Sequence, residues 1–144
     1  MTRSAAQIWA QLIGFVLVVA GVIGFFYSSA FGSPGETDAV FGILDVNGFH
    51  NLVHIASGLL GLMLARSYSG ARTYCLLLAA AYTVVAIWGF VIGDGEAILS
   101  IIPVNTEDNV LHALIALVSL AVGVGTSAVP RPSTTEPGRG FRYN

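Results

Sequence analysis

The sequence predicts an all-α integral membrane protein, a four-helix bundle made of two parallel helix-hairpin repeats with both termini in the cytoplasm. Its 144 residues are 55% hydrophobic and only 10% charged, with no lysine, whereas a soluble domain carries about 25% charged residues. Four long apolar segments follow one another along the chain. One polar motif, N-x-x-x-N-x-x-H, occurs twice, beginning at Asn47 and at Asn105.

The first apolar segment, Ile8–Ser28, is long enough to cross a hydrocarbon core about 30 Å thick as a helix. A cleaved signal peptide is the alternative, because Arg3 gives a basic start and Ser28-Ser29-Ala30 resembles a cleavage site. We favour a retained span, because residues 21–26 (GVIGFF) resemble residues 86–91 (AIWGFV) of the third segment.

The other three predicted spans are Phe49–Ala65, Tyr74–Ile92 and Val110–Val129. The connection over residues 31–45 is rich in turn formers and acids, and we expect it in water or at the membrane surface. Residues 97–103 are apolar but too few to span, which predicts an interfacial or re-entrant segment.

The domain organisation follows from these segments. Residues 1–129 form one four-span domain, whose repeats cover about 8–66 and 74–129 with a polar turn at 66–72 between them. Residues 130–144 contain three prolines and three arginines without apolar periodicity, which predicts a flexible cytoplasmic tail.

The charges predict the orientation. With four spans, all the basic residues fall on one side, and the positive-inside rule makes that side cytoplasmic. They are Arg3, Arg66, Arg72, Arg131, Arg139 and Arg142. Seven of the eight acids fall on the other side: Glu36, Asp38, Asp45, Asp94, Glu96, Glu107 and Asp108. We therefore expect a multi-pass protein of the cytoplasmic (inner) membrane of a bacterium.

The two motif copies keep one offset, since 105 − 47 and 112 − 54 both give 58. Each copy is joined to two spans, so the second copy enters the membrane in the same direction as the first. Such parallel repeats differ from the inverted repeats of many transporters, which disfavours an alternating-access carrier.

The first asparagine of each copy, Asn47 and Asn105, is predicted to be a helix N-cap. Its side-chain oxygen can accept from backbone N–H groups that have no partner within the helix. Glu107 and Asp108 near the second cap favour the positive end of the helix dipole.

The deeper polar residues of each motif are Asn51 with His54 and Asn109 with His112, three apart on one helix face. Small residues continue this face, so we expect the second and fourth spans to pack on each other and bring His54 and His112 to one depth. Three interpretations are open: a structural clasp of Asn51, His54, Asn109 and His112, a His54–His112 pair that binds haem or a metal, and a polar path for protons or a small solute. With His50, Asp45 and the acids of the loops, a cation site at the membrane surface is a further variant.

The chain resembles a bacterial family of small four-span membrane proteins catalogued as a domain of unknown function. The resemblance rests on Asn47 with His50–His54, on Pro103-Val104-Asn105 with Asp108–His112, and on residues 58–62 (GLLGL). It covers about residues 10–125 and implies the fold and topology, but no activity.

The functional prediction is a non-enzymatic interaction or accessory subunit of a larger membrane assembly. Lipid is the expected surrounding, with a membrane protein partner or self-association. No cofactor is expected on this hypothesis, and haem belongs to the histidine-pair alternative. Hydrolase motifs such as G-x-S-x-G and H-E-x-x-H are absent from the sequence. The net charge of −2 gives no indication of nucleic-acid binding.

Overall fold

The computed structural model describes residues 3–31 and 38–127. Four helices run along one long axis: α1 (Ala5–Tyr27), α2 (Gly48–Leu64), α3 (Tyr68–Ile92) and α4 (Thr106–Gly125). The predicted tail, together with Glu36, Arg131, Arg139 and Arg142, lies outside the described residues.

Three of the four helices are long and apolar enough to cross a membrane. α1, α3 and α4 have 23, 25 and 20 residues, and an 18-residue stretch of each has a mean hydropathy of 2.3, 2.3 and 1.7, respectively. α2 is apolar but has 17 residues, a length of about 26 Å at 1.5 Å per residue. The described part of the chain is thus mostly helical, as predicted, with one helix shorter than the rest.

The helix starts differ from the predicted spans where local capping extends them. α1 begins at Ala5 because Ser4 and Gln7 form a capping box. α3 begins at Tyr68, within the expected polar turn, because the Ser67 side chain accepts from the Gly70 N–H and caps the helix there.

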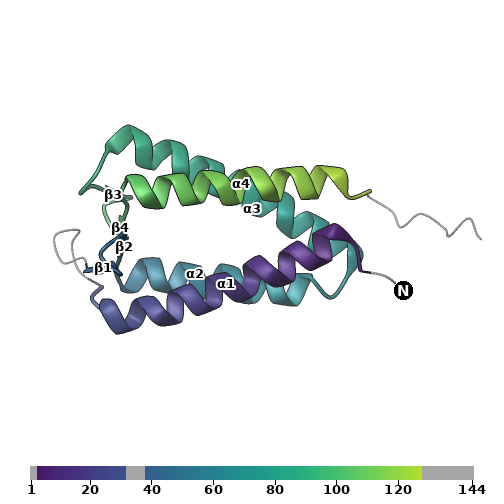
Figure 1. The fold of residues 1–144 in the computed structure, drawn as a ribbon, viewed down its shortest axis with the longest axis horizontal. Helices are drawn as coiled ribbons and strands as arrows, with labels where there is room; N and C mark the ends of the chain where they lie inside the picture. Colours follow the sequence, from purple (N-terminus) through teal and green to yellow (C-terminus); the bar gives the residue numbers. More distant parts are fainter. Residues whose placement is uncertain (1–2, 32–37, 128–144) are drawn as a thin grey trace, which may run out of the picture.

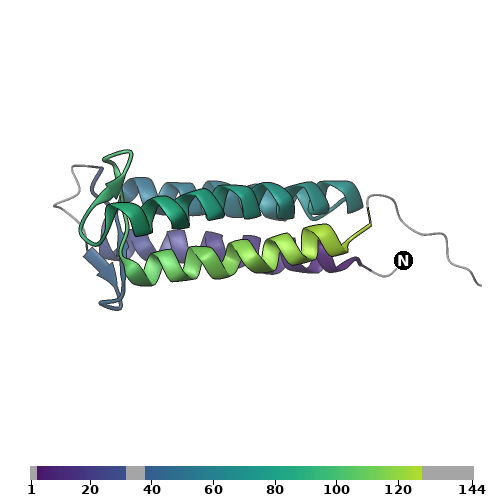
Figure 2. The same ribbon diagram turned by 90° about the horizontal axis from the view of Figure 1, so that it is seen from above.

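Two short β-hairpins connect the helices at one end of the bundle, where the sequence suggested irregular connections and an interfacial segment. β1 (Asp38–Val40) pairs with β2 (Leu44–Val46), and β3 (Ala97–Ile98) pairs with β4 (Ile102–Pro103), both antiparallel. Figures 1 and 2 show all four strands at this end, which we call the hairpin end.

α2 packs along α1, and α4 packs along α3, so the chain forms two antiparallel helix pairs (Figure 1). α2 and α4 do not pack along each other as expected, because Gly58 of α2 and Gly123 of α4 each face the partner helix of their own pair. A Cβ at Gly58 would lie 2.6 Å from the Gly14 carbonyl oxygen of α1. A Cβ at Gly123 would lie 2.8 Å from Leu76 Cδ2 of α3. The Gly58 contact, against backbone, requires glycine, whereas at Gly123 the Leu76 side chain would have to shift.

The two helix pairs meet in an apolar core that extends from the other end of the bundle to its middle. Its buried members are Ala6, Ala10, Ile13, Leu17, Ala65, Ala71, Tyr74, Cys75, Leu78, Tyr82 and Ala116. At this end the Trp9 indole N–H donates to Ser119 Oγ at 2.9 Å, and Arg72 Nε donates to the Thr126 carbonyl at 2.9 Å.

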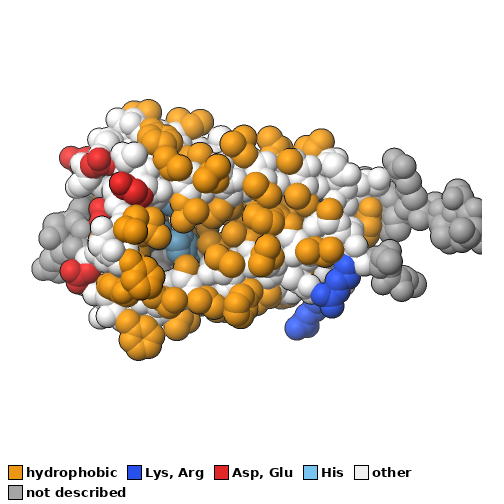
Figure 3. All heavy atoms as spheres, in the orientation of Figure 1, with side chains coloured by type: hydrophobic (Ala, Val, Ile, Leu, Met, Phe, Trp, Pro, Cys, Tyr) orange, Lys and Arg blue, Asp and Glu red, His pale blue; other side chains and the backbone are white. Residues whose placement is uncertain are grey.

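The described charges are separated along the bundle. Arg3, Arg66 and Arg72 lie at the end opposite the hairpins, which we call the arginine end, while the acidic side chains gather at the hairpin end (Figure 3). Large apolar side chains between the two ends are exposed, among them Leu12, Phe15, Leu59, Leu77 and Leu117. The surface between the charged ends is therefore suited to lipid.

Candidate metal site

The hairpin end is held together by the two predicted capping asparagines. Asn47 is the N-cap of α2, and its Oδ1 accepts from the His50 N–H at 2.9 Å. The Asn47 Nδ2 donates to the carbonyl of Ile101, in the other hairpin, at 2.7 Å. One buried side chain thus caps its own helix and ties it to the second half of the chain.

Asn105 makes the equivalent bonds from α4. Its Oδ1 accepts from the Asp108 N–H at 2.9 Å, and its Nδ2 donates to the Ile43 carbonyl at 2.7 Å. Because each asparagine reaches the opposite hairpin, the starts of α2 and α4 are fixed relative to each other. These are the two helices that carry the histidines.

Left-handed backbone conformations in the hairpin turns position the two carbonyls that accept hydrogen bonds from Asn47 and Asn105. Phe41 and Leu99 have φ of 54° each, followed by Gly42 at 71° and Ser100 at 59°. Non-glycine residues in this region cost about 1 kcal/mol or more each. Such local strain persists where the surrounding bonds fix the conformation, as the two asparagine amides do here.

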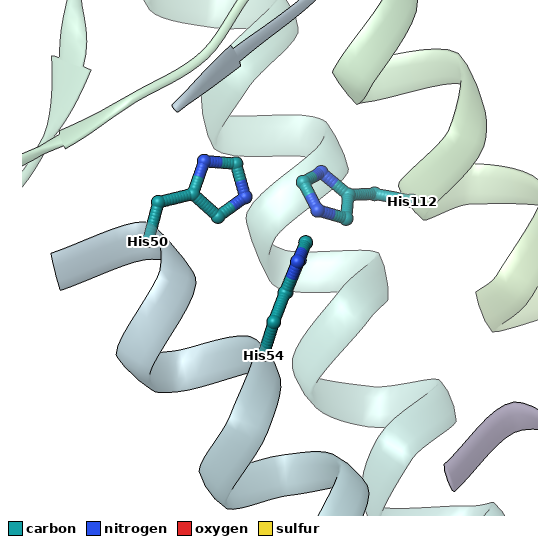
Figure 4. A group of neighbouring side chains, drawn as sticks. All are labelled: His50, His54 and His112. Carbon is teal, nitrogen blue, oxygen red and sulfur yellow. The ribbon is translucent and has the colours of Figure 1, made fainter. Parts of the chain in front are cut away.

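Three histidines converge just beneath these caps (Figure 4). His50 and His54 come from successive turns of α2, and His112 reaches them from α4. Their nearest potential ligand nitrogens all lie within 4.8 Å of one another. The ring centroid of His50 is 4.5 Å from that of His54 and 6.0 Å from that of His112, and the His54–His112 distance is 6.3 Å. The protein has only these three histidines.

The third histidine is the residue that sequence reasoning did not join to the pair. The sequence associates His50 with the acids at the membrane surface, but in the structure His50 is buried, at 2% exposure, beside His54. The available signal was the spacing of four between His50 and His54, which puts both on one face of a helix.

Hydrogen bonding orients the His50 ring. Its Nδ1 lies 2.9 Å from the Asp45 carbonyl oxygen, which can only accept, so Nδ1 carries the hydrogen and Nε2 has its lone pair free. The Asp45 N–H in turn donates to Asp108 Oδ2 at 3.0 Å. A backbone carbonyl that fixes the tautomer of an imidazole is the usual outer-shell support of a metal-binding histidine.

The acids add negative charge near the cluster. Burial raises the pKa of the Asp45 carboxyl, and the charges of Asp94 and Glu107 raise it further. Among the described residues, the three arginines all lie at the opposite end of the bundle. The described charged groups near the three imidazoles are therefore all acidic, and a cation bound there would favour the ionised form of the Asp45 carboxyl.

A small cavity of about 50 Å³ adjoins all three histidines. Its walls are His50, Val53, His54, Tyr82, Val85, Ile98, Ile102 and His112. A water molecule needs roughly 10–15 Å³ of such volume, so an ion with a bound water has room here.

The two deeper asparagines point away from the histidines. Asn51 Nδ2 donates to the Ser28 carbonyl at 2.8 Å, and a Cβ at Gly24 would collide with Asn51 Oδ1. Asn109 faces Gly89 of α3 in the same manner. Among the described residues, the Asn51 amide therefore ties α2 to the end of α1, whereas the Asn109 amide packs against Gly89 without a hydrogen-bond partner, and neither bonds to a histidine.

Comparison with known proteins shows the family of the chain. Residues 7–125 match the model of the family described as "Domain of unknown function (DUF4383)". The chain belongs to the DUF4383 family. No curated protein and no solved structure matches it. The matched segment runs from the first turn of α1 to the end of α4 and contains both hairpins and all three histidines of this DUF4383 member, which agrees with the resemblance noted in the sequence.

Proposed function

We propose that this protein spans a membrane and binds one transition-metal ion between His50, His54 and His112. The convergence of three imidazoles from two helices, in a chain with no other histidine, carries the proposal. Neutral imidazole suits zinc, copper, nickel and iron, and three histidines leave a fourth position open for water or another ligand.

The distances allow such a site after a small closure of the rings. With metal–nitrogen bonds of about 2.0–2.1 Å, ligand nitrogens of a tetrahedral site lie about 3.4 Å apart. The present upper limit is 4.8 Å, and small χ rotations of the three side chains would close the difference. The fixed tautomer of His50 supplies one preoriented ligand nitrogen.

The three-histidine arrangement favours a small ion over haem. A haem with His54 and His112 as axial ligands would lie between the two imidazole rings. Its macrocycle is wider than an imidazole and would need free space on all sides of the pair. The His50 ring, with its centroid 4.5 Å from that of His54, occupies part of that space.

A polar path through the bundle has less support. Asn51, His54, Asn109 and His112 all lie in the hairpin half of their helices. From the middle to the arginine end, the described interior is dominated by apolar side chains such as Ala10, Ile13 and Leu17.

The membrane topology and the internal repeat belong to the same proposal. The separated charges support a hairpin end outside and an arginine end in the cytoplasm of a bacterial inner membrane. The repeat is supported by bonds that recur 58 residues apart, as for Asn47 and Asn105. The role of an accessory subunit stays a prediction, for which recovery of a specific partner in mild detergent is the test.

The metal proposal is tested on the full chain purified with a tag that contains no histidine. After loading with Zn²⁺, Cu²⁺, Ni²⁺ or Fe²⁺ and gel filtration, we expect about one ion per chain of at least one metal by mass spectrometry. His54→Ala and His112→Ala should each weaken the metal affinity by about 100-fold or more, because loss of an outer-shell partner alone costs about 10–100-fold.

Val53→Ala is the matched control, because it shortens a side chain of the same small cavity without removing a nitrogen ligand. It should bind the metal as the parent does. A parent protein that retains none of the four metals, or histidine variants that bind as tightly as the parent, would contradict the proposal.

A further inference from the structure

A second and larger cavity lies on the other side of the histidines, between α1 and α4. Its volume is about 390 Å³, within the range of roughly 300–1,000 Å³ typical of small-molecule sites. Val16, Ala20, Leu111 and Ile115 line it from the two helices. Figure 3 shows this face as a hollow between apolar side chains, with a histidine visible at its floor.

The cavity results from how the helix pairs meet. At the arginine end, small residues such as Ala6 and Ala10 let the pairs approach closely, and Trp9 bonds to Ser119 across α1 and α4. At the hairpin end, β1 and β2 fill the space between the pairs, with Phe41 and Val46 on the cavity wall. The opening between α1 and α4 lies on the exposed apolar surface, where lipid is expected.

The floor of the cavity is polar, in contrast to its walls. His54, Asp108 and His112 are its polar members. His112 is 5% exposed, and its Nδ1 has no hydrogen-bond partner among the described residues. An unpaired buried polar nitrogen is costly, so a ligand that supplies a hydrogen bond there gains free energy.

The charges at the floor select the kind of head group. Asp108 and Asp45 are acidic, and the described arginines lie at the far end of the molecule. No described cation lies near the floor to pair with the anionic carboxylate of a fatty acid or with a phosphate group, so burying either of them there would be costly.

We propose that this cavity binds a neutral lipid-soluble molecule with a carbonyl or hydroxyl head group, of the kind found in quinones and long-chain alcohols. The molecule enters sideways from the bilayer between α1 and α4, its apolar body lies against Val16, Ala20 and Ile115, and its head oxygen hydrogen-bonds to His112. The proposal does not require a bound metal, because the imidazole itself provides the polar partner.

Competition against a photoreactive probe tests this proposal. The full-length, chelator-treated protein in lipid nanodiscs is labelled with a twelve-carbon alcohol that carries a diazirine, and labelled residues are mapped by mass spectrometry. We expect labels on cavity residues such as Leu111 and Ile115. Decylubiquinone or dodecanol should reduce the labelling several-fold. The stronger competitor of the two shows whether the site prefers a carbonyl or a hydroxyl head group.

Two further competitors test the polar floor. Dodecane has no head group and dodecanoate has an anionic one, so both should compete weakly. If dodecane competes as well as the neutral ligands, the cavity holds only apolar chains and the proposal is wrong. If dodecanoate competes best, the argument from charge is wrong, and labelling confined to the outer surface would also overturn the proposal.

A matched pair of variants completes the test. Ala20→Phe places a ring in the cavity and should reduce the labelling several-fold, whereas Ala121→Phe, on the exposed face of α4, should leave it unchanged. Equal labelling of the two variants would contradict binding in the cavity between α1 and α4. Metal binding by Ala20→Phe is measured in parallel, so that failure here is distinguishable from failure of the metal proposal. The competition series on the parent protein stands if the variant does not fold.

Discussion

Single glycines determine where the buried asparagines can lie. Asn51 and Asn109 are 0% and 1% exposed, and each is accommodated because a glycine on the neighbouring helix has no side chain. For Asn51 that glycine is Gly24, and the amide then reaches the Ser28 carbonyl near the end of α1. Hydrogen bonds of this kind between helices contribute about 0.6 kcal/mol on average in a membrane.

Substitution of Gly24 by Ala should therefore destabilise the protein. The new methyl group collides with Asn51 Oδ1, and overpacking of a tight site costs about 1–3 kcal/mol. We expect a lower free energy of unfolding in a titration with SDS, followed by circular dichroism.

Gly125→Ala is the control, because a Cβ there meets nothing within 4 Å and lies in the last turn of α4. It should leave the stability unchanged or raise it by up to about 1 kcal/mol through helix propensity. If Gly24→Ala unfolds like Gly125→Ala, the tight packing of Asn51 against α1 is wrong.

At the scale of elements, the hairpins do more than connect helices. The turn of each hairpin presents a carbonyl to an asparagine of the other half, and β2 presents the Asp45 carbonyl to His50. The geometry of a three-residue strand therefore influences which His50 nitrogen can bind a metal.

The two turns offer a reciprocal test of this backbone geometry. Gly42 and Ser100 occupy left-handed conformations, with φ of 71° and 59°. Ser100→Gly should raise the free energy of unfolding by about 0.5–1 kcal/mol, because glycine adopts positive φ without steric cost. Gly42→Ser should lower it by a similar amount.

The measurement is the same SDS titration, applied to both variants and to the parent. Opposite signs for the two substitutions are expected. Equal signs would show that the turns do not have the described backbone conformation.

Sequence patterns predicted the elements that are specified locally, and missed those that depend on tertiary contacts. The helices and the caps at Asn47 and Asn105 follow from apolar runs and from a capping residue at each start. The hairpin of β3 and β4 was missed because Leu99 and Ser100 are not residues that usually adopt the left-handed conformation its turn requires. His50 could not be joined to His112 without the relative placement of α2 and α4.

The packing faces were likewise ambiguous in the sequence. Gly58 and Gly61 indicated that α2 approaches another helix closely, but a row of small residues on one helix face does not identify the neighbouring helix. In the structure Gly58 faces α1, and Gly61 faces Tyr74 of α3.

At the scale of the whole molecule, the proposed topology gives a prediction about accessibility. The only cysteine, Cys75, is buried, so Cys75→Ser gives a background for labelling. In this background Ser29→Cys, beside the hairpin end, should react in intact cells with a membrane-impermeant maleimide. Ser69→Cys, at the arginine end, should react only after the membrane is permeabilised.

Both serines are exposed in the structure, so burial does not explain a difference between them. Labelling of unfolded protein in SDS measures the total thiol in each sample. The reverse pattern would show that the protein has the opposite orientation, and equal labelling of both sites in intact cells would contradict the spanning topology.

The reciprocal hydrogen bonds of Asn47 and Asn105 to the opposite hairpins suggest an origin for the proposed metal site. In the proposed repeat, Asn47 and Asn105 are equivalent, and a single helix pair could make the same bonds with a second copy of itself across a twofold axis. In such a dimer every residue near the axis occurs twice. His54 and His112 keep that equivalence, whereas the position of His50 is occupied by Asp108 in the second half. Joining two copies in one chain allows the two halves to diverge, so that one contributes two imidazoles to the proposed site and the other contributes one imidazole together with the carboxylate that accepts from the Asp45 N–H.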